Sequence, residues 1–146
     1  MMRRLLTACA FLSLAGCLDP GDPVLAVRDT DPPEVQSTEP VASGQIASDG
    51  SLEITFSEFM DVRTLRPGIA VFSGRDEVPL TITVPAPTDG SGNVEGGDIP
   101  YTVKVRATSG AFTPNASFTL VLRTILSDYE GNALTEEVRV PFRTGL

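Results

Sequence analysis

The stretch that decides the fold is Ser51–Asp61, SLEITFSEFMD, because its first half alternates strictly between polar and apolar side chains. Leu52, Ile54 and Phe56 fall on one side of an extended chain, and the residues between them fall on the other. A period of two with one apolar face predicts a strand that buries one side and exposes the other to water.

The same alternation recurs downstream and predicts four further strands, at residues 78–84, 101–106, 118–123 and 138–143. Two weaker apolar segments, 35–38 and 69–72, complete a set of seven strands, and one helical turn is expected at 61–65. Seven short strands separated by turn residues are typical of an immunoglobulin-like β-sandwich, so the predicted fold class is all-β with a single domain. Pro141 further predicts that the last strand is an edge strand or is bulged there.

Several motifs share an order and spacing with a known family. They are PEVQSTEP at 33–40, FSEFMD at 56–61, FTP at 112–114, DYEGN at 128–132 and FRT at 142–144. Together they resemble the bacterial Ig-like domain of S-layer and surface proteins, over about residues 32–145. Phe59 and Phe118 replace a proline and a tyrosine of the family pattern, and neither change threatens the fold. The resemblance implies an architectural module without catalytic activity.

The first residues have the composition of an export signal. Two arginines precede an apolar stretch that is too short to span a bilayer permanently, which takes about 20 apolar residues. Leu14-Ala15-Gly16-Cys17 resembles the lipobox at which bacterial lipoproteins are cleaved and receive diacylglycerol on the cysteine sulfur. We therefore expect residues 1–16 to be a cleaved signal peptide and Cys17 to carry lipid. An ordinary secreted protein and an uncleaved membrane anchor are the alternatives.

Residues 17–33 are rich in proline and aspartate and predict a flexible linker between the lipid and a folded part at residues 34–146. Leu18 follows the lipidated cysteine, and in enteric bacteria an aspartate at that place retains a lipoprotein in the inner membrane. The leucine therefore favours the outer membrane. The predicted location is the cell envelope, with the protein held to a membrane by the lipid on Cys17.

The composition excludes several function classes. The net charge is −8 over the whole chain, and losing Arg3 and Arg4 with the signal makes it about −10, so a nucleic-acid partner is not expected. The chain has no histidine and one lysine, which removes the commonest general base and zinc ligand. Catalysis would have to use carboxylates alone, and nothing in the sequence specifies a cleft for a glycosidase pair. We expect no enzyme activity and no cofactor, with calcium as the one open possibility.

The segment 85–100, PAPTDGSGNVEGGDIP, is one candidate calcium loop. Asp89 and Asn93 stand at positions where such a loop places oxygen ligands, and Glu95 falls at the seventh place. Pro100 occupies the twelfth place, where a bidentate glutamate is needed, so the match is partial. A glycine-rich loop between two strands is the favoured interpretation.

A second candidate is a group of acids that follow two strands: Glu58, Asp61, Asp128 and Glu130. Their loops are expected to meet at one end of the sandwich, where carboxylate oxygens would suit calcium. The favoured alternative is structural. Asp61 would cap the helical turn, Asp128 would accept backbone N–H bonds in the Gly131-Asn132 turn, and ion pairs would form with Arg63 and Arg66.

The sequence thus predicts a lipid-anchored envelope protein with a non-catalytic Ig-like module that is structural, adhesive or partner-binding. Its partners would be the membrane, through the lipid on Cys17, and an envelope protein or a glycan. The alternative is a calcium- or carbohydrate-binding accessory module.

Overall fold

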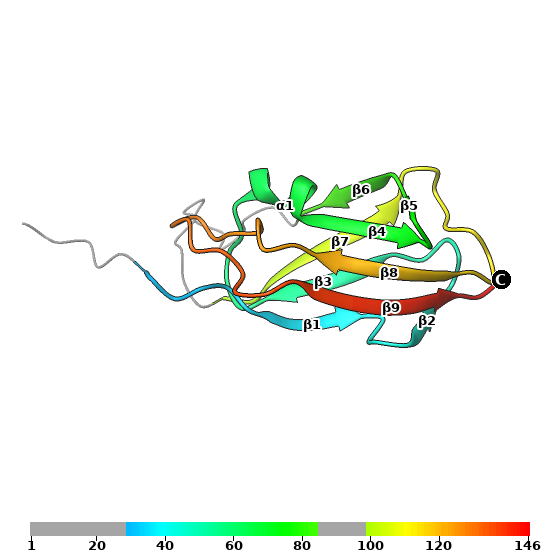
Figure 1. Cartoon of the computed structure of the whole chain (residues 1–146), viewed down its shortest axis with the longest axis horizontal. Coiled ribbons are helices and arrows are strands. Elements are labelled where there is room, and N and C mark those ends of the chain that lie inside the picture. Colours follow the sequence, from blue (N-terminus) through cyan, green and yellow to red (C-terminus); the bar gives the residue numbers. More distant parts are fainter. Residues whose placement is uncertain (1–28, 85–98) are drawn as a thin grey trace, which may run out of the picture.

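The protein is described here by a computed structural model, in which residues 29–84 and 99–146 form two packed β-sheets and one short helix (Figure 1). The elements are β1 (Val35–Glu39), β2 (Gly44–Ile46), β3 (Leu52–Phe56), α1 (Val62–Gly68), β4 (Ile69–Ser73), β5 (Asp76–Glu77), β6 (Leu80–Thr83), β7 (Tyr101–Ala107), β8 (Ser117–Leu122) and β9 (Val138–Thr144). The predicted all-β sandwich is confirmed.

The two sheets differ in how their strands pair. One sheet has the order β1-β3-β7-β6, and all its neighbours are antiparallel. The other has the order β2-β9-β8-β4-β5, in which β2 alone runs parallel to its neighbour, β9. The described part of the chain enters the sandwich at one end and the C-terminus lies at the other (Figure 1).

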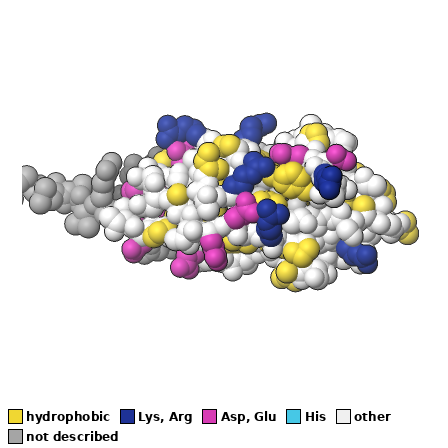
Figure 2. Space-filling model, viewed as in Figure 1, with side chains coloured by type: hydrophobic (Ala, Val, Ile, Leu, Met, Phe, Trp, Pro, Cys, Tyr) yellow, Lys and Arg dark blue, Asp and Glu magenta, His cyan; other side chains and the backbone are white. Residues whose placement is uncertain are grey.

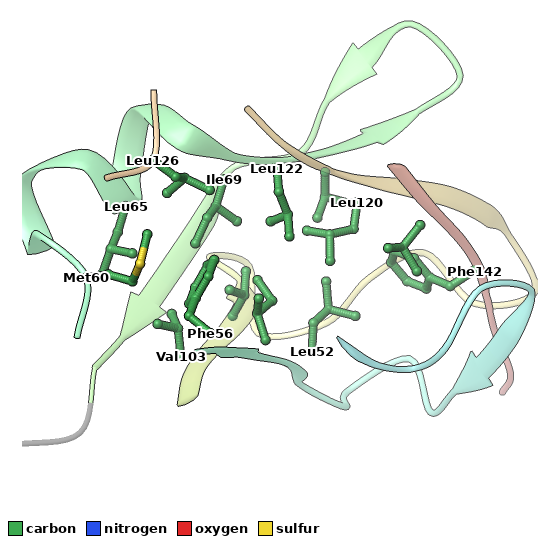
Figure 3. Close-up of a cluster of buried hydrophobic side chains, with 14 of the residues drawn as sticks. Leu52, Phe56, Met60, Leu65, Ile69, Val103, Leu120, Leu122, Leu126 and Phe142 are labelled. Carbon is green, nitrogen blue, oxygen red and sulfur yellow. The ribbon is translucent and has the colours of Figure 1, made fainter. Parts of the chain in front are cut away.

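The core lies between the sheets and is made by the apolar positions that the alternation predicted. Leu52, Ile54 and Phe56 of β3 are each fully buried. Leu52 and Phe56 face Leu120 and Leu122 of β8 across the core (Figure 3). Phe112, Phe118 and Phe142 form an aromatic cluster, with ring centroids 5.3 to 5.9 Å apart. Burying aliphatic and aromatic side chains contributes about 1.5–3 kcal/mol for each one, so this core stabilises the domain without a disulfide.

All seven predicted strands are present, and within the described residues the structure adds two that were not predicted. β2 is three residues long and β5 is two, too short for either strand to show an alternating pattern. The alternation over residues 118–123 predicts that Val121 lies on the exposed face of its strand, but the residue is buried, at 2% exposure. Its strand β8 lies inside the five-stranded sheet, between β4 and β9.

The environment of Pro141 differs from its prediction. β9 is not an edge strand, because β2 pairs with it from Gly44↔Phe142 onward, and its register with β8 is unbroken at Pro141↔Thr119. The carbonyl of Pro141 accepts a hydrogen bond from the N–H of Ser43 at 2.6 Å. The nitrogen of Pro141 points to the same side of the strand, one residue before the ladder with β2 begins, so no ladder hydrogen bond is lost.

The predicted helical turn is confirmed and extends to Gly68. Asp61 is the N-cap of α1, and its side chain accepts a hydrogen bond from the N–H of Arg63. The N–H of Ile69 closes the helix by donating to the carbonyl of Leu65, and the chain continues into β4. Among the described residues no helix has the length and the apolar character that crossing a membrane requires.

Candidate functional site

The segments that leave β3 and β8 meet at the end of the sandwich where α1 lies. Met60 and Asp128 form an isolated antiparallel bridge, and the N–H of Asp61 donates to the carbonyl of Ser127 at 2.8 Å. The hydroxyl of Thr64 accepts from the N–H of Ser127 at 3.2 Å. These bonds bring the two acidic motifs, 70 residues apart in sequence, into one cluster.

Asp61 has a structural role within this cluster. Its carboxylate forms a bidentate pair with Arg63, with oxygen–nitrogen distances of 2.6 to 3.0 Å, and also accepts from the N–H of Arg63. The hydrogen bonds from the Arg63 side chain are the main cause that lowers the pKa of Asp61, and partial burial opposes them. This carboxylate is therefore occupied by the helix cap and the ion pair with Arg63, as the structural interpretation expected. The ion pair expected for Arg66 does not form among the described residues.

Asp128 holds the turn that follows it. One carboxylate oxygen accepts from the N–H groups of Gly131 and Asn132 at 2.6 and 2.8 Å, and the other accepts from the Asn132 side-chain amide at 2.7 Å. The side chain is almost fully buried, at 1% exposure. Gly131 has a φ of +94°, in the region of backbone conformation that favours glycine, whereas Asn132 does not have a positive φ. Part of the sequence prediction for this turn is thus confirmed, and the role of the Asn132 amide was missed.

The carboxylate oxygens of Glu58, Asp128 and Glu130 lie within 4.8 Å of one another. Glu58 and Asp128 are buried and Glu130 is exposed. Asp61 is not in this group. Three carboxylates at this spacing offer the hard oxygen ligands that calcium prefers, although a calcium ion takes six to eight oxygens in all, so water or backbone carbonyls would have to supply the others.

Three further predicted residues lie outside the described residues: Cys17, Asp89 and Asn93. The same holds for the predicted signal peptide and most of the predicted linker, of which residues 29–33 are described.

The surface carries mixed charge. On the face shown in Figure 2, several acidic side chains gather at the lower left, and basic and acidic side chains are interspersed over the rest. Two of the pairs are Arg139 with Glu137 at 2.6 Å and Arg123 with Glu77 at 3.6 Å. Such exposed pairs contribute little to stability, and their main effect is to offset charge locally.

Comparison of folds finds similar solved structures, and three of them are described here. The N-terminal part of the bacterial S-layer protein SbsC aligns with a TM-score of 0.48 and 20% identity, covering 77% of this chain and 23% of that one. A longer SbsC structure gives 0.45 and 18%, covering 77% and 14%. PcoC, a methionine-rich copper resistance protein from Escherichia coli, gives 0.49 and 15%, covering 77% and 97%. The chain spans less than a quarter of either S-layer structure.

No curated protein is significantly similar to the chain in sequence. A family model described as "Bacterial Ig-like domain" matches residues 29–144, which is most of the chain and the whole of the sandwich. The matched range agrees with the motifs around β1, β3, β8 and β9. The chain belongs to the bacterial Ig-like domain family.

Proposed function

We propose that this protein is a lipid-anchored component of the cell envelope, and that its Ig-like domain acts without catalysis as a structural, adhesive or partner-binding module. The observation that carries the proposal is the combination of a family match over residues 29–144 with the lipobox-like sequence that ends at Cys17. The outer membrane is the proposed location, because Leu18 follows the cysteine.

The anchor is supported by charge as well as by sequence. A chain with a net charge of −8 is repelled by anionic headgroups, so electrostatics give no attachment to a membrane surface. Each buried methylene of an acyl chain contributes about 0.8 kcal/mol, and several chains on one cysteine hold a protein almost permanently. A disulfide would not compete for the sulfur of Cys17, because Cys9, the other cysteine of this sequence, would leave with the signal peptide.

Metabolic labelling with a radioactive fatty acid tests the anchor directly. Native protein is expected to take up label and to fractionate with membranes, whereas Cys17→Ser takes up none and is released from them. Cys9→Ser is the matched control and is expected to label like the native chain. Equal labelling of native protein and Cys17→Ser would refute the anchor.

The non-catalytic role is supported by what the carboxylates at the acidic cluster do. The Asp61 carboxylate accepts four hydrogen bonds from Arg63 in the helix cap and the ion pair. The Asp128 carboxylate accepts three from Gly131 and Asn132 in the turn. The partner would be an envelope protein or a glycan. Affinity capture from envelope extracts is expected to enrich one partner with the native chain. A control chain unfolded by Ile54→Asp should not enrich that partner. Equal recovery of the partner by the native chain and by the control would count against the proposal.

Calcium binding is the second candidate, and it rests on the approach of Glu58, Asp128 and Glu130 to within 4.8 Å. Millimolar calcium is expected to raise the melting temperature of the native chain, and Glu130→Gln should remove most of that rise. Glu136→Gln, an exposed acid elsewhere on the surface, is the control. No calorimetric heat and no change in melting temperature would leave the cluster with a structural role alone.

A further inference from the structure

The four-stranded sheet ends in β6, and this edge lacks the protection found at the other edges. Edge strands present unpaired N–H and C=O groups, which proteins usually guard with charges, bulges or very short strands. β5 is two acidic residues long, β2 is three residues long, and β1 has a register shift between Val35 and Ser37. β6 has four uncharged residues in unbroken register with β7.

The pairing of β6 with β7 fixes which backbone groups point away from the sheet. The N–H of Thr108 donates to the carbonyl of Pro79 at 2.8 Å. In an antiparallel pair alternate residues exchange hydrogen bonds with the partner strand, so residues 81 and 83 bond to β7 as residue 79 does. The residues between them direct their N–H and C=O groups outward. These are Leu80, Ile82 and Val84.

Within residues 29–84 and 99–146, no backbone hydrogen bond reaches these outward groups. The side chains of the same three residues are half-buried and pack against the rim of the core. Leu80 and Ile82 line a groove of about 450 Å³ together with Val78 and with Ile69 of β4, and the side chains of Arg66 and Glu77 also line this groove. The edge therefore combines unpaired backbone groups with a row of incompletely covered apolar side chains.

We propose that β6 pairs with β6 of a second copy of this chain, antiparallel and about a twofold axis at Ile82. This register sets Ile82 opposite itself, Leu80 opposite Val84, and Thr81 opposite Thr83. Apolar side chains then meet apolar ones over the groove, and threonines meet threonines on the outer face. The outward backbone groups of all three apolar residues meet as hydrogen-bonded pairs, and the two four-stranded sheets become one.

The register is specific, because a shift of one residue would place every apolar side chain opposite a threonine and move it to the wrong face. A twofold contact of this kind is closed, so it gives a dimer and not a fibre.

Charge also favours this edge. Two copies with a net charge of −8 repel each other, and the repulsion is least where the contacting strand is uncharged. The inference goes beyond the proposed function, since it holds whether or not the chain carries lipid.

Analytical ultracentrifugation of the full-length chain tests the contact. The chain carries Cys9→Ser and Cys17→Ser, which prevent lipidation and adventitious disulfides. The chain is expected to form a dimer, and the double substitution Thr81→Glu with Thr83→Glu should weaken it roughly tenfold, because each new carboxylate faces another across the axis. In the monomer the same carboxylates face Arg106 and Lys104 of β7, so the fold is kept. Gln36→Glu with Ser37→Glu, at the β1 edge, is the matched control and should leave the dimer unchanged. A chain that is monomeric at every concentration, or two double variants that behave alike, would overturn the proposal.

Oxidative cross-linking tests the register in the same background. Ile82→Cys places two thiols opposite each other at a Cα separation of about 5.5 Å, within reach of a disulfide. Thr81→Cys is offset from its own copy and should cross-link far less. Equal cross-linking of the two variants would exclude a twofold axis at Ile82.

Discussion

Gly68 at the end of α1 packs directly against Leu126, so closely that a β-carbon at position 68 would lie 2.4 Å from the Leu126 Cγ. Both residues are buried, and the contact ties the helix to the segment that follows β8. The glycine is required here by space and not by backbone conformation.

Gly68→Ala is therefore expected to destabilise the fold by about 1–3 kcal/mol through overpacking. Leu126→Ala alone should cost about 2–5 kcal/mol because it leaves a cavity. The double variant should cost clearly less than the sum, since the new methyl group enters the space that the leucine vacates. Urea denaturation of the three variants measures this. Additive losses would mean that the two residues do not compete for the same space.

Gly131→Ala tests the opposite case, a glycine with open space around it. No atom lies within 4 Å of a β-carbon built at Gly131, but its φ of +94° is unfavourable for other residues. We expect a loss of about 1–2 kcal/mol in the free energy of unfolding, from backbone strain alone. Gly50→Ala, where φ is not positive but the Ala47 carbonyl oxygen lies 2.9 Å away, provides a steric comparison. An unchanged stability for Gly131→Ala would show that the turn relaxes to another conformation.

Asp128→Ala is expected to cost about 2–4 kcal/mol, because the N–H groups of Gly131 and Asn132 lose their acceptor in a partly buried turn. Asp128→Asn should cost less. The new side chain keeps an acceptor for the two N–H groups, and it loses the bond to the Asn132 amide. Thermal and urea unfolding at pH 7 would rank the two variants. If both lost the same stability, the negative charge rather than the hydrogen bonds would be what the turn requires.

The pair between Asp61 and Arg63 predicts a specific pH dependence. Arg63 lowers the pKa of the Asp61 carboxyl below its ordinary value of 3.8. The contribution of this pair to stability is therefore fully present above that unfolded-state value and is lost as the pH falls through the lower folded-state pKa. Arg63→Gln should be less stable than the native chain at neutral pH, and the difference should close in strong acid. Urea unfolding across pH measures the difference.

Arg66→Gln is the control for this experiment, since Arg66 has no ion pair among the described residues. Its difference from the native chain should not depend on pH in the acid range. A gap for Arg63→Gln that stayed constant down to the acid limit would contradict the assignment of the lowered pKa to this pair.

The strands with strict alternation were predictable because burial on one face imposes a period of two on the sequence. Leu52–Phe56 coincides with β3, and 101–106 differs from β7 by one residue. β2 and β5 could not be predicted from pattern. Gly44–Ile46 forms a strand because β9 offers a partner, and two acidic residues form β5 because they complete a hairpin with β4. Their cause is tertiary, so no local signal marks them.

The acidic cluster was predictable in place and only partly in membership. An acidic motif follows each of the strands β3 and β8 directly, so the sequence predicted that the two loops would meet. Asp61 lies apart from the other acids because its carboxylate pairs with Arg63. The sequence does not show that this bidentate contact forms. The buried position of Val121 depends likewise on strand order, which alternation does not specify.

The parallel pairing of β2 with β9 helps the domain to resist a pulling force that acts along its strands. The chain enters at one end of the sandwich and the C-terminus lies at the other (Figure 1), and Gly44–Ile46 runs alongside Phe142–Thr144. A pull between the two ends draws these strands in opposite senses along their length. Their hydrogen bonds are then loaded in shear and must rupture together, whereas bonds pulled open from one side would break one after another. This three-residue ladder therefore resists a pull between the two ends of the sandwich together with the pairing of β1 and β3, which the entering chain forms first.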